Sequence, residues 1–493
     1  MKIIDAFLNN ITMYKLVFYG LLVLLGIACF LSLFNKLSFD IYSLVFTASF
    51  ITFFSWIANK VFASFFKAVT NFESVYISAL ILSLIVQPTR NFADLLPLFV
   101  LAILSQGSKY ILAVNKKHFF NPAAFALCIS PFLMNLGPSW WVGNPYMVIP
   151  TFLLGLLIVR KIQRWDLVLS FFVTFSLMIL FTSFLKDDLS FTRIVFGNFL
   201  SIFFAFIMLT EPQTTPPKRT LRILYGGLVG LIFGSNLHFG PLYTTPEMSL
   251  VLGNIFSYIV SPKEKLLLFL KEKIKLTPNI YDLVFKVDKK ANFLPGQYME
   301  WTLAGKEKID IRGNRRYFTL ASSPLEDNLR IGVRFSDPGS SFKRQLLSMK
   351  TGDKILAGSL SGEFTLPKDK NKKLVFIAGG IGITPFRSMV KYLLDTNEKR
   401  DIVLFYSVKT QADAVYKDIF KKAENLGVKS LIWETDKQGV ITEKWISQEI
   451  PDYRKRQFYL SGPHSMVDSF KETLEKMGVS NNKIKIDFFP GYV

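Results

Sequence analysis

Charge is spread very unevenly along this chain of 493 residues, and no other feature of the sequence constrains the fold as strongly. Residues 1–260 contain 17 Lys and Arg with 9 Asp and Glu. Residues 261–493 contain 41 Lys and Arg with 28 Asp and Glu. A stretch of 260 residues with so few charges does not form the water-facing surface of a globular domain. We therefore predict a membrane-embedded helical domain over residues 1–260, followed by a water-soluble part.

Ten apolar runs divide the first part and predict ten membrane crossings. Several are shorter than the roughly 20 residues that a straight span requires. Short or Gly/Pro-interrupted runs indicate broken or re-entrant helices, which occur where a site lies inside a bundle. The runs lie at about residues 13–35, 40–58, 74–88, 94–114, 121–134, 146–159, 165–185, 189–210, 222–236 and 246–260.

The charges in the loops between these runs predict the orientation of the chain. If the N-terminus lies inside, the inside loops contain twelve Lys and Arg and the outside loops contain four. Cytoplasmic loops of membrane proteins carry this kind of excess. We therefore expect a multi-pass protein of the cell membrane, in contact with lipid, whose N-terminus and water-soluble part both lie in the cytoplasm.

Composition excludes several classes of site. Cys29 and Cys128 are the two cysteines, so this chain alone cannot supply the four thiolates of an iron–sulfur cluster, and we expect neither a disulfide scaffold nor a metal site. The net charge is +21, but no basic–aromatic motif accompanies it, so we expect no nucleic-acid binding and interpret the lysines as a solvated surface near an anionic membrane. Lys109, in an otherwise apolar stretch, is either paired or functional.

The water-soluble part contains two kinds of pattern. Apolar and polar residues alternate over residues 266–290, as they do in a β-strand. Short strands with Gly and Pro turns continue to about residue 365, which indicates an antiparallel β-barrel. From residue 373, three apolar strands each lead into a helix, which indicates an α/β lobe that binds a nucleotide at the C-termini of its parallel strands. The expected fold class is thus a membrane α-helical bundle, a barrel domain at 262–368 and an α/β domain at 369–493.

Six short motifs follow one another through these two domains. Gly380, Gly382 and Pro385 form a turn between a strand and a helix, and the backbone amides of such a turn suit a pyrophosphate. The motifs are RRYFTLASSP (315–324), DPGSSFKRQL (337–346), GSLSGEF (358–364), AGGIGITPFRSM (378–389), YLSGPHSM (459–466) and KIDFFPGYV at the chain end.

The order of barrel and lobe, together with these six motifs, resembles the ferredoxin–NADP⁺ reductase family over about 230 residues. The resemblance implies that FAD binds the barrel and NAD(P)H binds the lobe. It also implies an oxidoreductase that transfers hydride from nicotinamide C4 to flavin N5, with the protein positioning the two cofactors.

For the flavin, the resemblance implies roles for the segment Arg316-Tyr317-Phe318-Thr319. The planar fork of Arg316 is suited to a flavin phosphate. Phe318 would stack on the isoalloxazine ring, and the Thr319 hydroxyl would hydrogen-bond N5.

A second flavin segment follows, in which a helix begins. Gly339 would permit close approach of the flavin pyrophosphate, and Ser340 and Ser341 would supply a helix cap and hydrogen-bond donors to it.

For the nicotinamide nucleotide, the resemblance implies that Gly380, Gly382 and Pro385 hold the pyrophosphate and that Thr384 lies near the nicotinamide. The choice between NADH and NADPH stays open. A 2′-phosphate would need a cation after the second strand of the lobe, for which Lys409 with Tyr416 and Lys417 is a candidate.

Three residues are predicted to be catalytic, namely Thr319, Ser461 and Asp487. Ser461 occupies the usual cysteine position of the family beside the hydride path. Asp487 and Phe489 resemble the family's terminal acidic-x-aromatic segment near flavin N5.

The runs KHFFNPAAF (117–125) and FFAFIMLTEPQTTPPKR (203–219) carry a second resemblance. They resemble the B subunit of the sodium-pumping NADH:quinone reductase and the D subunit of the Rnf complex, over roughly residues 75–260, with Glu211 in place of an Asp. This implies ten helices in two inverted five-helix repeats. Those subunits carry covalent FMN on a Thr in an S-G/A-A-T segment that is missing here, so a non-covalent flavin (FMN or riboflavin) or a quinone stays open.

These resemblances favour a membrane-bound NAD(P)H oxidoreductase that passes electrons to a quinone or a membrane flavin, with ion coupling left open. A haem-containing ferric reductase or NADPH oxidase would need pairs of histidines, whereas the chain has only His118, His238 and His464. Two more hypotheses stay open, namely a transporter or channel gated by a redox domain, and a haem-free ferric or flavin reductase that is merely anchored to the membrane.

Overall fold

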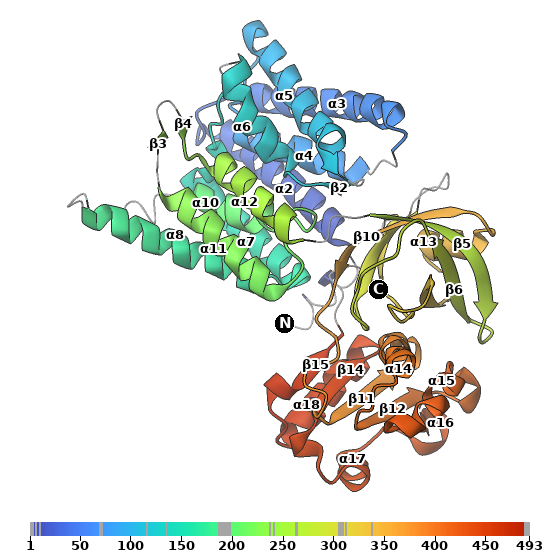
Figure 1. Ribbon diagram of the computed structural model, residues 1–493. Coiled ribbons are helices and arrows are strands. Elements are labelled where there is room, and N and C mark those ends of the chain that lie inside the picture. The colour runs from blue at the N-terminus through green and yellow to red at the C-terminus, as the bar shows by residue number, and fades with distance from the viewer. Residues whose placement is uncertain are drawn as a thin grey trace. The chain divides into compact units, whose positions relative to one another are not determined.

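Two compact units make up the chain in the computed structural model, unit 1 at Met1–Lys265 and unit 2 at Leu266–Phe489 (Figure 1). The structure describes residues 4, 7–8, 11–68, 72–114, 117–134, 136–185, 199–235, 238–239, 242–261, 265–303, 310, 313–336 and 339–487.

Unit 1 is built from helices, five of which are long and apolar enough to cross a membrane within the described residues. Their most apolar 18-residue windows have mean hydropathies of 1.2 to 2.6. These helices are α2 (Met13–Leu33), α3 (Ile41–Phe65), α5 (Phe92–Ile111), α7 (Pro145–Ile162) and α8 (Trp165–Leu185).

The ten predicted crossings exceed this number because the remaining helices of the described residues are short. A cap and a proline begin α12, where Thr245 accepts a hydrogen bond from Met248 and Pro246 follows. The apolar run at 189–210 lies largely outside the described residues. The short helices are α4 (Phe72–Ile85), α6 (Pro122–Met134), α10 (Leu200–Phe203), the π-helix η2 (Phe204–Met208), α11 (Arg219–Ser235) and α12 (Pro246–Val260).

Glycines let α11 lie against the backbone of α8. A Cβ atom built on Gly226 would be 2.5 Å from the Leu167 carbonyl oxygen, and one built on Gly230 would be 2.4 Å from that of Phe171. Small residues four positions apart on one face permit this close approach of apolar helices, which gain most of their contact energy from packing.

The first half of unit 2 is a curved six-stranded antiparallel sheet with strand order β8-β7-β10-β5-β6-β9. The amide of Ala321, just beyond β8, donates to the Arg330 carbonyl oxygen in β9, which joins the two edges of the sheet. The elements are β5 (Leu266–Lys275), β6 (Ile280–Val287), β7 (Tyr298–Thr302), β8 (Arg315–Thr319), β9 (Asn328–Arg334), helix α13 (Ser341–Ser348) and β10 (Lys354–Ser361).

The second half of unit 2 is a five-stranded parallel sheet with strand order β13-β12-β11-β14-β15 (Figure 1). One apolar cluster packs α14 and α15 on one face, and another packs α17 and α18 on the other. The elements are β11 (Leu374–Gly379), α14 (Thr384–Thr396), β12 (Ile402–Val408), α15 (Lys417–Lys422), β13 (Val428–Glu434), α16 (Thr435–Gln438), α17 (Glu443–Glu449), β14 (Gln457–Ser461), α18 (His464–Lys476) and β15 (Ile484–Ile486).

This arrangement confirms the predicted antiparallel sheet followed by a parallel α/β sheet. The chain leaves β11 toward β12 and later returns on the other side as β14, so the strand order reverses between β11 and β14. Ligands of open parallel sheets bind at such a reversal, outside the carboxyl ends of the strands.

The contact between α8 and α11 makes a first prediction. Gly230→Ala should destabilise unit 1 by about 1–3 kcal/mol, because the new Cβ would lie 2.3 Å from Thr174 Oγ1 in a packed interface. Gly227→Ala is the matched control, since its nearest neighbour would be 3.5 Å away, and it should be neutral or stabilise the helix by up to about 1 kcal/mol. Thermal unfolding of both variants in detergent measures the difference, and equal Tm values would contradict the packing argument.

Candidate functional site

Three segments that are far apart in sequence meet at the carboxyl end of β14. The Ser461 hydroxyl, on the last residue of β14, donates to Asp487 Oδ2 at 3.0 Å. Asp487 follows β15, and its amide donates to the Leu460 carbonyl oxygen at 2.9 Å. The hydroxyl of Thr319, the last residue of β8, also lies at the Asp487 carboxyl group. The structure therefore brings together Thr319, Ser461 and Asp487, the three residues predicted to be catalytic.

The environment of Asp487 changes its acidity. Burial raises the pKa of its carboxyl group from 3.8 to about 7, and the hydroxyls of Ser461 and Thr319 only partly oppose this effect. A carboxyl group with this pKa is divided between its protonated and ionised forms near neutral pH. Asp487 can therefore hold or release a proton under physiological conditions.

The glycine turn after β11 lies directly against the end of β14. Gly380 has φ +51°, a left-handed conformation that suits glycine. A Cβ atom on Gly382 would be 2.4 Å from the Ser461 carbonyl oxygen, so glycine is required for the turn to approach Ser461 this closely. The turn leads into α14, where Thr384 is the first residue and Pro385 the second. Its backbone amides form the kind of helix start that binds anions.

The residues predicted to hold flavin phosphates also lie together. The Arg316 side chain is buried, and its guanidinium lies 5.3 Å from the centre of the Phe342 ring in α13. Ser340 caps α13 by accepting a hydrogen bond from the Lys343 amide at 3.2 Å. The Ser341 amide donates to the carboxylate of Asp310 at 2.8 Å, so the first turn of this helix already binds an anionic group.

Glycine and the aromatic residues of the flavin segments have clear positions. A Cβ atom on Gly339 would be 2.8 Å from the Ser336 carbonyl oxygen, so glycine is required for this close approach. Phe318 lies 6.0 Å from the Phe342 ring, on the same face of β8 as Arg316. Tyr317 points to the other face, where its hydroxyl donates to Glu300 at 2.9 Å.

The remaining predicted positions are less informative. Phe489 lies outside the described residues. The candidate cations for a 2′-phosphate, Lys409 and Lys417, are both exposed, and Lys417 donates to the Gln411 carbonyl oxygen. Tyr416 faces Arg387 instead, with its ring centre 5.6 Å from the guanidinium.

Sequence motifs did not indicate the role of Arg387, although it lies within AGGIGITPFRSM. Its side chain is buried and pairs with Glu326 in the barrel. One feature of the sequence could have indicated it. Arg387 lies at a position that the helical spacing of the apolar residues places on the buried face of the helix.

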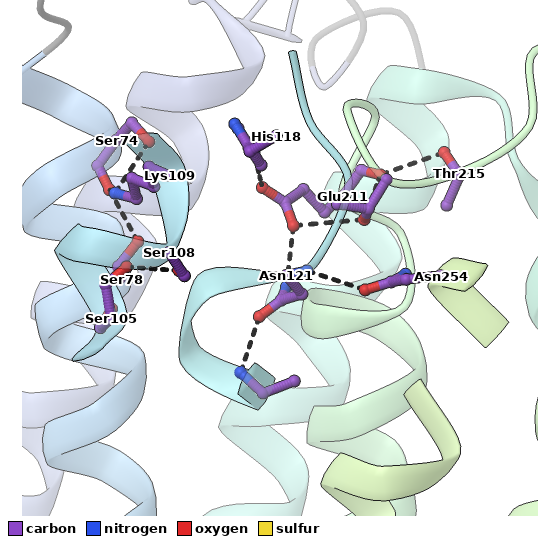
Figure 2. A network of polar contacts seen from close by, with 12 residues as sticks. Ser74, Ser78, Ser105, Ser108, Lys109, His118, Asn121, Glu211, Thr215 and Asn254 are labelled. Atoms are coloured by element: carbon purple, nitrogen blue, oxygen red, sulfur yellow. Dashed lines mark hydrogen bonds and ion pairs between the residues drawn. The ribbon is translucent and has the colours of Figure 1, made fainter. Parts of the chain in front are cut away.

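A second polar cluster lies in unit 1, at the start of α6 and just beyond the end of the π-helix η2 (Figure 2). Asn121 caps α6 by accepting from the Ala124 amide at 3.0 Å, and its side-chain amide donates to Glu211 Oε2 at 2.9 Å. Glu211 lies just beyond the π-helix η2, and its Oε1 is 3.7 Å from Nε2 of His118. The side-chain oxygen of Asn254 in α12 accepts a hydrogen bond from the backbone amide of Asn121 at 2.7 Å. The two motifs HFFNPAAF and TEPQTT therefore meet at one site.

Lys109 belongs to a separate network in the same unit (Figure 2). Its Nζ atom donates to the Ser74 carbonyl oxygen at 2.9 Å and to Gln106 Oε1 at 3.0 Å. The sequence left open whether this lysine is paired or functional, and the structure shows that it is paired.

Comparisons with known proteins agree with the geometry of unit 2. Residues 376–472 match the family model of the oxidoreductase NAD-binding domain. A flavohemoprotein of Oceanobacillus iheyensis is 26% identical over 235 residues, which are 44% of this chain and 57% of that protein. The NADPH oxidoreductase of Mycobacterium tuberculosis is 27% identical over 196 residues, which are 38% of this chain and 50% of that protein. The xylene/toluene monooxygenase electron transfer component of Pseudomonas putida is 26% identical over 277 residues, which are 53% and 76%.

Among solved structures, a cytochrome P450 reductase from Amycolatopsis matches with a TM-score of 0.41 and 23% identity, over 46% of this chain and 70% of that one. The chain spans about half the length of the first curated relatives that it matches. The predicted resemblance of the C-terminal half to flavin-dependent NAD(P)H reductases is confirmed. The resemblance of the N-terminal half to ion-pump subunits stays a prediction.

The pKa of Asp487 predicts how stability depends on pH. Because the folded pKa of about 7 lies above the usual 3.8, the folded state binds this proton more tightly than the unfolded state. The contribution is complete below about pH 4 and is lost as the pH rises through 7, by up to about 1.4 kcal/mol per pH unit. Asp487→Asn cannot ionise, so its Tm relative to wild type should rise from pH 5 to pH 8. A constant Tm difference across this range would contradict the assignment.

Proposed function

We propose that this chain is a membrane-embedded flavoenzyme that takes hydride from NAD(P)H onto FAD and passes the electrons to an acceptor in its helical unit. The observation that carries the proposal is the meeting of Thr319, Ser461 and Asp487 beside the glycine turn, where the strand order reverses. A hydride path needs a nucleotide turn and a flavin segment at one place, and these residues come from both.

The residues present fit a flavin dinucleotide on residues 262–368. Arg316 and the first turn of α13 lie side by side, and a cationic fork next to the start of a helix suits a diphosphate. Asp487 Oδ1 is buried and makes no hydrogen bond of standard geometry to the described residues, so it is available to a ligand. FAD, when bound, supplies the atom that accepts the hydride and releases the electrons one at a time.

The chain's own residues would position the reactants and hold protons. On residues 369–493, the amides of Gly380 and Gly382 bind the pyrophosphate of NAD(P)H, and Thr384 at the start of α14 orients the nicotinamide. Ser461 holds one oxygen of Asp487, which keeps the carboxyl group aimed at the site. With a pKa of about 7, Asp487 exchanges a proton as the charge at the site changes.

For the acceptor, the cluster at Glu211 supports a quinone or a non-covalent flavin in the helical unit. Reduction of a quinone takes two electrons and two protons, and the carboxyl group of Glu211 with the imidazole of His118 would relay these protons from water. Ionisable side chains are rare in apolar helical bundles and mark functional sites there. Short helices such as α6 and π-helices such as η2 often lie at functional sites.

Residues 1–260 would span the membrane, with the N-terminus and the reductase in the cytoplasm. Five apolar helices and the excess of cations in the predicted inside loops support this placement. A channel gated by the reductase, or a simple membrane anchor, would leave Glu211 without a role in electron transfer.

Cofactor content tests the proposal directly. We expect the full chain, purified in mild detergent, to release one FAD per chain and to reduce ferricyanide with NADH or NADPH. A second flavin would identify the acceptor as a membrane flavin, and FAD alone would favour a quinone. Purified protein that binds no FAD, or that oxidises neither nucleotide, would overturn the proposed function.

Substitution of Glu211 separates the two halves of the reaction. Glu211→Gln keeps the size of the side chain but cannot exchange a proton, so quinone reduction should fall about tenfold to a hundredfold. Ferricyanide takes single electrons without protons, so its reduction should stay within twofold of wild type. Lys109→Met, in the neighbouring network, is the control and should leave the ratio of the two rates unchanged. An unchanged ratio in Glu211→Gln would exclude this cluster as the acceptor site.

A further inference from the structure

A group of charged side chains joins the barrel to α14, outside the site that the motifs indicated. Arg387 of α14 is 4% exposed, and Asp282 of β6 is 2% exposed. Glu326, in the turn before β9, and Arg330 of β9 lie between them. Charged side chains are this deeply buried only where they pair with an opposite charge, so each of the four side chains needs its partner in place.

Arg387 holds the barrel through a two-pronged contact. Its Nη1 and Nη2 atoms lie 2.6 Å and 3.1 Å from the two carboxylate oxygens of Glu326. Nη1 also donates to the Ala321 carbonyl oxygen at 2.6 Å. A planar guanidinium that binds both oxygens of a carboxylate fixes orientation as well as distance. Ala321 is only two residues beyond Thr319, so this contact lies next to the proposed hydride path.

The next residue of α14 makes a second contact to the same segment. The Ser388 hydroxyl donates to the Ser322 carbonyl oxygen at 2.6 Å, and both residues are fully buried. Two consecutive side chains of α14 therefore hold two consecutive carbonyl groups that follow the flavin strand. The first turn of the same helix carries Thr384 and follows the glycine turn directly.

Glu326 is itself held rigidly from the barrel side. Its Oε2 atom accepts from the Ser323 amide at 2.7 Å, and Oε1 lies 3.5 Å from Arg330 Nε. Burial raises the pKa of Glu326, but hydrogen bonds and charge from Arg387 outweigh that effect and leave the pKa below its usual value. Arg330 reaches on to Asp282 at 3.0 Å. Arg387 thus binds the Glu326 carboxylate, which cannot move independently of the antiparallel sheet.

Close packing around α14 leaves little freedom for the two halves to shift. A Cβ atom on Gly332 of β9 would be 2.6 Å from Thr384 Cγ2 and 2.8 Å from the Tyr416 hydroxyl. Tyr416 has a left-handed backbone, with φ 61°, and its ring lies against Arg387. The start of α14 therefore approaches the barrel as closely as a glycine permits.

We propose that the Arg387–Glu326 pair is a positioning device for hydride transfer, which sets the distance between the nucleotide turn at Gly380–Ile383 and the flavin segment that ends at Thr319. The inference rests on the proposed function. Arg387 touches no reacting atom, and it acts through the helix whose start holds the nucleotide. Reacting atoms must approach to about 3–3.5 Å, and an error of 1 Å can cost about a hundredfold in rate.

A second buried arginine of the same lobe provides a matched control. Arg456 is 7% exposed, and its Nη1 and Nη2 atoms lie 2.6 Å and 3.2 Å from the two oxygens of Asp401. Its Nε atom donates to Asp452 at 2.6 Å. All these partners belong to the lobe, and Arg456 precedes β14, at the opposite end of the strand from Ser461. Loss of Arg456 should therefore weaken the lobe without moving it relative to the barrel.

The experiment compares Arg387→Met, Glu326→Gln and Arg456→Met in the full chain with FAD bound. Flavin reduction is followed under anaerobic conditions by stopped flow, with NADH or NADPH and with the same nucleotide deuterated at C4. Arg387→Met should lower the limiting rate about tenfold to a hundredfold, change the Kd of the nucleotide by less than about twofold, and increase the isotope effect. Glu326→Gln keeps the shape of the side chain and should show the same pattern at about threefold to tenfold. Arg456→Met should stay within twofold of wild type in rate, even if its Tm falls.

Each outcome decides between the inference and the function on which it rests. A limiting rate in Arg387→Met no lower than in Arg456→Met, or an effect confined to the Kd, would overturn the positioning role and leave the proposed function intact. If Arg387→Met does not fold, Glu326→Gln decides the question by the same criteria. Wild-type protein whose flavin neither nucleotide reduces would instead overturn the proposed function.

Discussion

Close approach of backbone to backbone at the end of β14 is the constraint on which the reductase site depends. Gly382 lies so near Ser461 that a single methyl group would collide with its carbonyl oxygen. This approach places the nucleotide turn next to the carboxyl end of the strand, where Ser461 meets Asp487. A parallel sheet makes the meeting possible, because the carboxyl ends of the neighbouring strands β11 and β14 lie on the same side of the sheet.

Burial of carboxyl groups is the second constraint, and its effect differs between two sites of unit 2. Asp487 receives only hydroxyl groups, so burial raises its pKa to about 7 and it can exchange a proton. Glu326 receives a full guanidinium, so its pKa is lowered and it stays charged as a fixed anchor. The partners thus distinguish a carboxyl group that can carry a proton from one that serves to hold structure.

Much of unit 2 follows from the sequence because its signals are local. Alternating strands, glycine turns and strand–helix repeats each involve neighbouring residues, and the family motifs indicated Thr319, Ser461 and Asp487. The Arg387–Glu326 pair joins residues 61 positions apart, and no local pattern shows which carboxylate a buried arginine will meet. The ten predicted crossings exceed the five long apolar helices of the described residues because every apolar run was counted as a crossing. The run at 246–260 does form α12, but its 15 residues are fewer than a straight span requires.

Both polar clusters lie where regular structure stops, and the physics of the backbone explains why. The end of a helix or strand leaves amide and carbonyl groups unpaired, which side chains or ligands must satisfy. At Asn121, a side chain caps α6 and also holds Glu211, so that one residue stabilises the helix and orients the carboxylate. At the start of α14, the Thr384 amide donates to the Ile381 carbonyl oxygen, and we propose that the nucleotide binds the preceding glycine turn. The same backbone requirement is therefore met by protein in unit 1 and, in our proposal, by cofactor in unit 2, where the rigid hold of Arg387 on the barrel keeps that cofactor in reach of the flavin.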